Sequence, residues 1–226
     1  MRENLTHVIE DYLKTIYGLT RDGRASTNQI AERMGVTPAS VTNMIQKLSG
    51  THPPLLDYRK HRGVLLTEEG EKIALEILRH HRLIEMFLHQ ALGYGWDEVH
   101  EEADRLEHVI SEEFEERIAE TLGNPEHDPH GDPIPSRDLR LPNTDEEMLS
   151  DLRTGQSGTV TRVRDTSPEL LRYLRDLGIK PGASVQVVVF SPFDQNLSLR
   201  IDNEQKPVVL GPSVTSQVYV HPAESE

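Results

Sequence analysis

The segment from His100 to His108 carries four side chains that can hold a metal ion. His100, Asp104, Glu107 and His108 lie at offsets that place all four on one face of a helix. Such a stripe is usually apolar and faces the core. Carboxylate and imidazole groups in a helical bundle are costly unless they pair or bind a cation. The spacing therefore indicates a metal site.

A second group with the same chemistry precedes this segment. His81 and Glu85 lie one helical turn apart, with His80 and His89 nearby, in a long predicted helix. Two antiparallel helices joined by a glycine-rich turn would bring the two groups together. Asp11, in the N-terminal helix, would supply a third wall. The alternative is a solvated, salt-bridged helix face, but matching offsets on two helices favour metal binding.

The donor types limit the metal. The chain has no cysteine, so disulfides and thiolate sites are excluded. Carboxylate and imidazole donors favour Mn(II), Fe(II) or Zn(II) over Cu(I), and a carboxylate-rich set leans toward manganese. We expect Mn(II), with Fe(II) as the second choice and Zn(II) binding in vitro.

The elements that position these groups begin with a predicted winged helix-turn-helix. Helical spacing covers residues 3–19, and a second helix over 27–34 is closed by Gly35. Thr37 caps a third helix that starts at Pro38 and runs to about residue 49. Two short strands around the basic run 59–62 form the wing.

This pattern predicts a DNA-binding surface, although a basic run alone is often only a solvated loop tip. The start of the third helix approaches the bases, and basic side chains contact phosphates. The predicted base-contacting residues are Thr37, Ser40, Thr42 and Asn43, and Pro38 belongs to the same DNA-binding set. The predicted phosphate contacts are Lys47, Arg59, Lys60 and Arg62.

The charge distribution agrees with this prediction, although acidic surfaces also simply aid solubility. The net charge is −14, but residues 1–65 hold nine Lys/Arg against six Asp/Glu, and the remainder holds 15 against 32. A mildly basic segment on an acidic body fits a phosphate reader attached to a cation-binding module. No apolar run is long enough to cross a bilayer, and the acidic N-terminus is unlike a signal peptide. We expect a cytoplasmic protein without a membrane partner.

Beyond the wing we expect three helices, followed by segments whose apolar residues alternate as in β-strands. Thr67 caps a helix that ends before Gly93, and further helices cover roughly 97–109 and 111–122. A loop over 123–147 leads to Val-rich segments that alternate at period two, interrupted by one helical piece at 168–178. The predicted fold class is mainly α with β, with three domains: a winged helix-turn-helix (1–73), a helical metal-binding domain (74–145) and a small β-barrel (150–221).

Several phrases resemble the diphtheria toxin repressor family of iron- or manganese-dependent regulators, from near residue 1 to residue 220. They are EDYLKTIY at 10–17, the helix-turn-helix phrase, HRLIE at 81–85, VHEEADRLEHVIS at 99–111 and HGDPIP at 130–135. LRDLGIKPGASVQV at 174–187 is similar to that family's SH3-like, FeoA-type C-terminal domain. This resemblance implies that the second predicted domain (74–145) is also the dimerisation domain and that the barrel (150–221) is SH3-like.

The resemblance implies two sets of ligands. The primary set would be Asp11, Asp104, Glu107 and His108, and the ancillary set His81, Glu85 and His100. Iron-type members have Met and Cys where Asp11 and Asp104 stand, so the carboxylates here are the manganese-type choice. Short manganese-type members have a further glutamate where this chain has Lys14. In the C-terminal domain Arg164 replaces a family glutamate, and Asp165 or Glu169 would have to substitute for it.

The resemblance implies a homodimeric, metal-dependent DNA-binding transcriptional regulator, by family default a repressor. It would sense Mn(II) or Fe(II), control metal uptake or homeostasis genes and bind a palindromic double-stranded operator. One alternative is a metal-independent winged-helix repressor, whose operator binding would survive chelation. Another is a metallohydrolase, prompted by His100-Glu101 with Asp104. That motif lacks a second histidine and a nucleophile, so we do not expect an enzyme.

Overall fold

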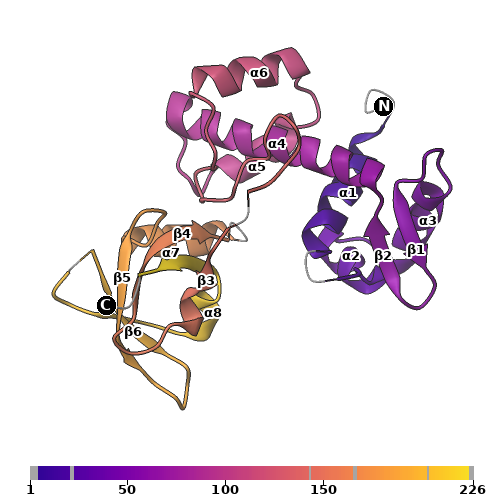
Figure 1. Ribbon diagram of the computed structural model, residues 1–226. Coiled ribbons are helices and arrows are strands. Elements are labelled where there is room, and N and C mark those ends of the chain that lie inside the picture. The colour runs from indigo at the N-terminus through magenta and orange to yellow at the C-terminus, as the bar shows by residue number, and fades with distance from the viewer. Residues whose placement is uncertain (1–4, 21–22, 143, 165–166, 203, 224–226) are drawn as a thin grey trace. The chain divides into compact units, whose positions relative to one another are not determined.

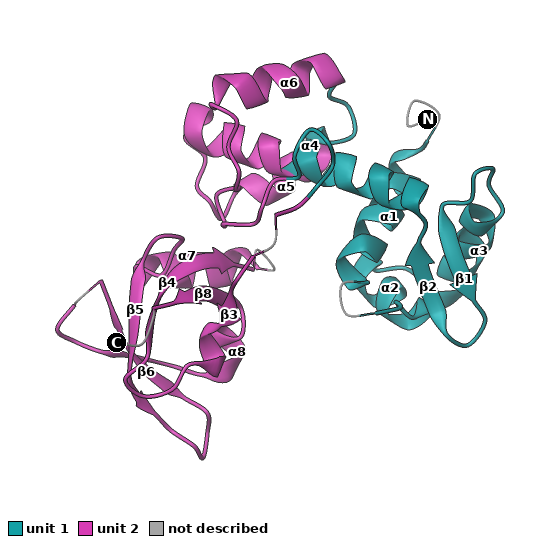
Figure 2. Ribbon diagram, viewed as in Figure 1, with its two compact units in different colours: residues 1–81, 106–111, 135–140 teal, residues 82–105, 112–134, 141–226 magenta. Residues whose placement is uncertain are grey.

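The computed structural model describes residues 5–20, 23–142, 144–164, 167–202 and 204–223. The chain divides into two compact units (Figure 2). Unit 1 comprises residues 1–81, 106–111 and 135–140, and unit 2 comprises residues 82–105, 112–134 and 141–226. Within the described residues, no helix has both the length and the apolar character needed to cross a membrane.

Unit 1 contains the predicted helix-turn-helix (Figure 1). Its helices are α1 (His7–Leu19), α2 (Thr27–Met34) and α3 (Pro38–Ser49). Ser26 and Gln29 form a capping box at α2, and Gly35 ends that helix with φ +65°. The Thr37 hydroxyl accepts a hydrogen bond from the Ser40 amide and caps α3, as predicted. Their buried apolar faces pack into one core that includes Leu13, Ile16, Ile30, Ile45 and Leu48.

The wing is an antiparallel pair of strands, β1 (Leu56–Arg59) and β2 (Gly63–Leu66). The Arg24 guanidinium donates to the backbone oxygens of Asp57 and Gly63 and pairs with the Asp57 carboxylate. The hydrogen bond from Arg24 lowers the pKa of Asp57 below its ordinary value of 3.8, despite partial desolvation. This contact fixes the wing to the segment between α1 and α2.

Three further helices follow: α4 (Glu68–Leu92), α5 (Val99–Leu106) and α6 (Glu112–Thr121). The Thr67 hydroxyl caps α4 by accepting from the Gly70 amide. The prediction that a helix continues to Val109 is wrong, because residues 107–109 form a turn in which the Val109 amide donates to the Leu106 oxygen. Glu107 and His108 are therefore in a turn, and the single helical face predicted for residues 100–108 ends at Leu106.

The C-terminal part of unit 2 is a six-stranded antiparallel sheet of order β3-β8-β4-β5-β6-β7. Its strands are β3 (Glu147–Met148), β4 (Ser157–Val163), β5 (Ser184–Phe190), β6 (Leu197–Ile201), β7 (Val208–Leu210) and β8 (Val218–Pro222). Among the described residues, β3 and β7 pair only with their inner neighbours, so the sheet is open where a barrel was predicted. The short β3 and β7 leave too few backbone groups to close it.

Three short helical elements accompany the sheet: η2 (Leu149–Asp151), α7 (Pro168–Asp176) and α8 (Pro212–Thr215). Pro168 and the Ser167 cap start α7 where the sequence predicted a helix. Leu171 and Leu174 of α7 are buried in the same core as Val160, Val185 and Leu199 of the strands. Trp96 belongs to this core as well.

The loop before the sheet packs against β4. Asp128 Oδ1 accepts hydrogen bonds from the amides of His130 and Asp132, which closes a tight turn. The Val163 amide donates to the His130 oxygen at 2.9 Å. A Cβ on Gly131 would lie 2.0 Å from the Thr161 oxygen, so only glycine permits this approach. The loop thereby holds the His130 side chain in a fixed place within unit 2.

Candidate metal centre and DNA-binding surface

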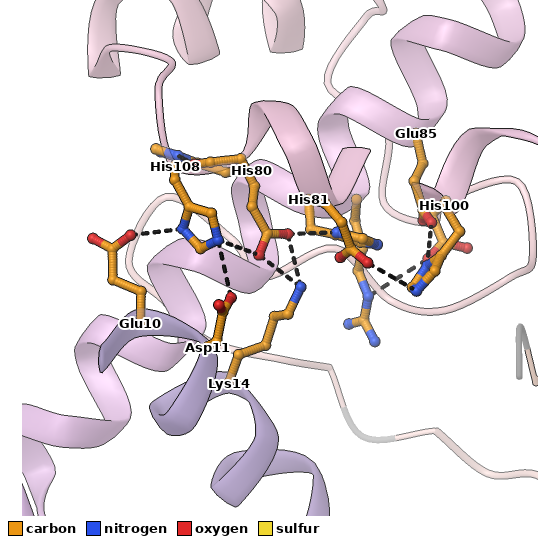
Figure 3. A network of polar contacts seen from close by, with 12 residues as sticks. Glu10, Asp11, Lys14, His80, His81, Glu85, His100 and His108 are labelled. Carbon is orange, nitrogen blue, oxygen red and sulfur yellow. Dashed lines mark hydrogen bonds and ion pairs between the residues drawn. The ribbon is translucent and has the colours of Figure 1, made fainter. Parts of the chain in front are cut away.

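Unit 1 brings together Asp11 from α1 and Glu107 and His108 from the turn after α5. One donor atom of each lies within 4.8 Å of the other two. His108 Nε2 is 3.0 Å from Asp11 Oδ1 and 3.4 Å from Glu107 Oε1. His108 Nδ1 is 2.7 Å from Glu10 Oε2, and Figure 3 shows the imidazole between Glu10 and Asp11. We call Asp11, Glu107 and His108 the α1 group.

The carboxylate of Glu107 is the most enclosed member of the α1 group. Its side chain is fully buried and contacts two basic side chains, Lys14 and His81. Lys14 Nζ lies 2.7 Å from Oε1 and 2.8 Å from Oε2, and His81 Nδ1 lies 2.5 Å from Oε2. The buried carboxylate of Glu107 is therefore held between two basic side chains, one from α1 and one from α4.

His108 is positioned by carboxylates on both ring nitrogens. Burial acts to lower the pKa of His108, but the hydrogen bonds to Asp11 and Glu10 and the charge of Glu107 outweigh it and raise this pKa. The His7 ring stacks on the His108 ring at 4.8 Å. When His108 donates a hydrogen bond from Nδ1 to Glu10, the lone pair of Nε2 is available to bind a metal, an arrangement common around ligating histidines.

Unit 2 contains a second group, made of Glu85 from α4 and Asp128 and His130 from the loop before the sheet. All three are buried, and one donor atom of each lies within 4.8 Å of the others. His130 Nδ1 is 3.8 Å from Glu85 Oε2 and 4.0 Å from Asp128 Oδ1. His130 Nε2 lies 2.6 Å from the Trp96 oxygen. Donation from Nε2 leaves Nδ1 as the ligating nitrogen. We call this the loop group.

The electrostatics of the loop group also suit a cation. Burial and the negative charges of Glu85 and Asp132 raise the pKa of Asp128 well above its ordinary value. Arg82 offsets part of this charge, because its guanidinium lies 3.5 Å from Asp128 Oδ2 and 3.1 Å from Asp132 Oδ1. A divalent cation would stabilise the charged carboxylates, and oxygen and imidazole donors fit Mn(II), Fe(II) or Zn(II). The residues of both groups therefore fit the metals expected from the sequence.

The remaining predicted ligands are distributed over the two units. In unit 1, His81 contacts Glu107 rather than standing apart from the predicted primary set. In unit 2, His100 Nδ1 is 3.1 Å from Glu85 Oε1, and His100 Nε2 is 3.6 Å from Asp104 Oδ2. Of the two residues considered as substitutes, Glu169 is exposed and accepts a hydrogen bond from Ser167, and Asp165 lies outside the described residues.

Sequence reasoning missed Asp128 and His130 of the loop group. It also missed Glu10 as a contact of His108 and Lys14 as a contact of Glu107. The HGDPIP phrase was noted only as a resemblance, yet it carries His130 and follows Asp128. The sequence signal was a histidine and two aspartates around a glycine, a residue that permits a tight turn; Gly131 indeed has φ +89°.

The predicted DNA-binding residues lie on α3 and the wing. All are exposed except Thr42, which is half-buried and whose hydroxyl donates to the Pro38 oxygen. The hydroxyls of Thr37 and Ser40 lie 2.9 Å apart. Asn43 and Lys47 are exposed one turn apart on α3. Arg59, Lys60 and Arg62 lie at the tip of the wing, where His61 adopts φ +64°.

Three family models match consecutive parts of the chain. Residues 4–64 match "Iron dependent repressor, N-terminal DNA binding domain". Residues 67–136 match "Iron dependent repressor, metal binding and dimerisation domain", and residues 148–222 match the FeoA domain.

Individual proteins are similar over nearly the whole chain. The iron-dependent repressor IdeR of Mycobacterium leprae is 32% identical over 218 residues, which cover 87% of this chain and 94% of that protein. The diphtheria toxin repressor of Corynebacterium diphtheriae is 29% identical over 197 residues, covering 82% and 86%. A solved manganese-dependent transcriptional repressor in complex with manganese is 38% identical, with a TM-score of 0.87 and coverage of 95% and 100%.

Proposed function

The chain belongs to the iron-dependent repressor family that includes the diphtheria toxin repressor, and we propose from this premise that it represses metal-uptake genes in response to Mn(II). It is a metal-dependent, DNA-binding transcriptional regulator with a dimerisation domain. We propose the domain limits 1–73, 74–145 and 150–221 and a palindromic operator bound by a homodimer. The observation that carries the metal proposal is the α1 group, because it joins the DNA-binding helices to a carboxylate–imidazole site.

The α1 group would hold the activating ion through Asp11, Glu107 and His108. The family resemblance adds Asp104 as a further ligand. When bound, the ion supplies a divalent charge that neutralises the carboxylates. Glu10 keeps the His108 ring oriented through Nδ1, since the two atoms are 2.7 Å apart. Asp11 is the member that α1 contributes, so a change in this group is transmitted directly to the helix-turn-helix core around Leu13 and Ile16.

We propose that the loop group is a second metal site, with Glu85, Asp128 and His130 as its ligands. His100 contacts Glu85 and would be either a ligand or a support for that carboxylate. Each buried carboxylate of this group raises the cost of charging the other, which a bound cation would remove. The choice of Mn(II) over Fe(II) rests on the donors, because neither group contains a thioether or a thiolate.

Regulation would follow from linkage between metal and DNA. If metal and operator prefer the same arrangement of the helix-turn-helix, each must tighten the binding of the other by the same factor. The exposed start of α3 would read the bases, and Lys47 with the wing tip would contact phosphates.

Operator binding measured by fluorescence anisotropy tests this proposal. The probe is a palindromic duplex selected from random DNA with the Mn(II)-loaded protein, and each titration is made with chelator and then with Mn(II), Fe(II) or Zn(II). Asp11→Asn and Glu107→Gln remove a ligand with little change of shape. Glu113→Gln, at a side chain that is 83% exposed on α6, is the matched control.

We expect wild-type and Glu113→Gln proteins to bind the operator more tightly with metal than in chelator, and the two ligand variants to lose that response. Tight binding in chelator that neither ligand variant alters would support a metal-independent winged-helix repressor instead.

A further inference from the structure

Lys14 places a positive charge at the carboxylate that the α1 group needs for its metal. It lies one turn after Asp11 on the same helix, and its Nζ contacts both oxygens of Glu107, at 2.7 and 2.8 Å. Figure 3 shows Lys14 beside Asp11 and directed toward the same cluster. Glu107 is fully buried, whereas 23% of the Lys14 side chain is exposed.

From this contact we infer that the Lys14 ammonium competes with the metal ion for Glu107 and thereby sets the metal concentration at which the protein responds. The inference rests on the proposed function of the α1 group. It concerns this chain's own lysine, which the ligand sets derived above do not include.

Two cations cannot share this carboxylate without a cost. A divalent ion bound through Glu107 would stand within a few ångströms of an ammonium that holds both oxygens, and like charges at that separation repel strongly in a partly buried site. Lysine has a flexible four-carbon stem and a compact, well-hydrated charge. Because Lys14 is already part-exposed, its ammonium can move into water and remain charged while the metal takes its place.

This exchange has opposite effects on stability and on metal affinity. Without metal, Lys14 compensates a buried carboxylate, and its removal leaves that charge less well paired. With metal, the ion compensates Glu107 and the lysine is no longer required. Metal affinity is therefore reduced in the wild type by the strength of the contact that must first be broken.

The test compares Lys14→Leu, Lys14→Gln and Lys14→Arg with the wild type by Mn(II) titration calorimetry and by the melting temperature of metal-stripped protein. Lys14→Arg keeps the positive charge. Lys72→Leu is the matched control, because Lys72 pairs with the exposed carboxylates of Glu68 and Glu69 on α4. Each titration is repeated with Asp128→Asn, which removes a ligand of the loop group and isolates the α1 group.

We expect Lys14→Leu to bind Mn(II) on the order of tenfold more tightly and to melt at a lower temperature without metal. Lys14→Gln, which keeps the polar group but loses the charge, should shift both quantities in the same directions and keeps the test open if the leucine variant folds poorly. Lys14→Arg and Lys72→Leu should bind Mn(II) as the wild type does.

A purely structural lysine would give a different result, with lower stability and metal affinity that is unchanged or weaker. That result in both neutral variants would overturn the inference and leave the proposed function intact. An equal gain in Lys72→Leu would also overturn it, since net charge would then be the cause. If the wild type binds no Mn(II) at the α1 group, the proposed function fails, and the inference fails with it.

Discussion

Replacing Gly131 by alanine should separate the loop that carries Asp128 and His130 from strand β4. Gly131 has φ +89°, and a Cβ there would lie 2.0 Å from the Thr161 oxygen and 3.0 Å from the Arg162 Cα. Both neighbours are backbone atoms of a central strand and cannot rotate away as a flexible side chain would. The loop itself must therefore shift, which strains the hydrogen bond from the Val163 amide to the His130 oxygen.

The size of the effect can be worked out against a control with the same backbone angle. Gly155 also has φ +89°, but a Cβ there would meet nothing within 4 Å. Alanine at a left-handed φ costs about 1–2 kcal/mol at either position. Losing the backbone hydrogen bond adds about 0.5–1.5 kcal/mol, and repacking the loop adds about 1–3 kcal/mol. Gly131→Ala should thus be less stable than Gly155→Ala by roughly 1.5–4.5 kcal/mol.

The assay is thermal unfolding followed by tryptophan fluorescence. Trp96 is the only tryptophan, it lies in the core of unit 2, and its backbone oxygen contacts His130. Since about 1 kcal/mol corresponds to roughly 2–4 °C for a chain of this size, the two variants should differ by at least about 3 °C. Equal melting temperatures would show that the loop does not pack on β4 as described, and would remove the support for a preformed loop group.

Two further outcomes concern the DNA-binding part. Lys60→Ala should weaken binding to all DNA sequences alike and reduce the salt dependence of log K by about 0.9 per lost phosphate contact, whereas Asn43→Ala should relax base preference and keep the slope. Anisotropy over a salt series measures both, and an unchanged slope for Lys60→Ala would contradict the wing assignment. Asp57→Asn should destabilise the protein at neutral pH. This difference should shrink as the pH falls below 3.8, because Arg24 holds the pKa of Asp57 below that value and the stabilisation is lost as the carboxylate becomes protonated. Melting curves from pH 7 to 3 measure it, and a difference that does not decrease below pH 3.8 would refute the reasoning.

The helices that could be predicted are those whose ends are fixed locally. The capping box of Ser26 and Gln29 and the Thr37-Pro38 start of α3 are short-range signals that the sequence displays directly. The end of α5 carries no such signal, because Leu106 to Val109 contains neither glycine nor proline. There the chain turns where Glu107 and His108 make contacts with α1, more than 90 positions earlier in the sequence.

In the candidate site too, some residues can be predicted from local sequence patterns and others depend on long-range packing. Residues at helical offsets, such as His81 and Glu85, can be found from periodicity alone. Glu85 meets Asp128 and His130 only because a loop more than 40 positions further along packs on β4, and no periodic pattern reports such a contact. Periodicity also assigns His81 to the same set as Glu85, although its nearest carboxylate in unit 1 is Glu107.

The contact between Lys14 and Glu107 changes how the metal switch must work. Helix α1 is tied to the turn at Glu107 by a lysine as well as by Asp11 and His108, so a metal ion does not create the connection between them. The metal ion replaces Lys14 as the positive charge beside Glu107. The regulatory free energy is then the difference between how strongly the metal and how strongly Lys14 hold α1 to this turn. Couplings of this kind are typically about 1–3 kcal/mol, or about 5–150-fold in affinity. The wild type should then keep a measurable operator affinity in chelator, and Lys14→Leu should lower that residual affinity while it increases the response to Mn(II). A metal-independent and a metal-dependent regulator would in this view differ in degree, according to the charge that this position of α1 presents to Glu107.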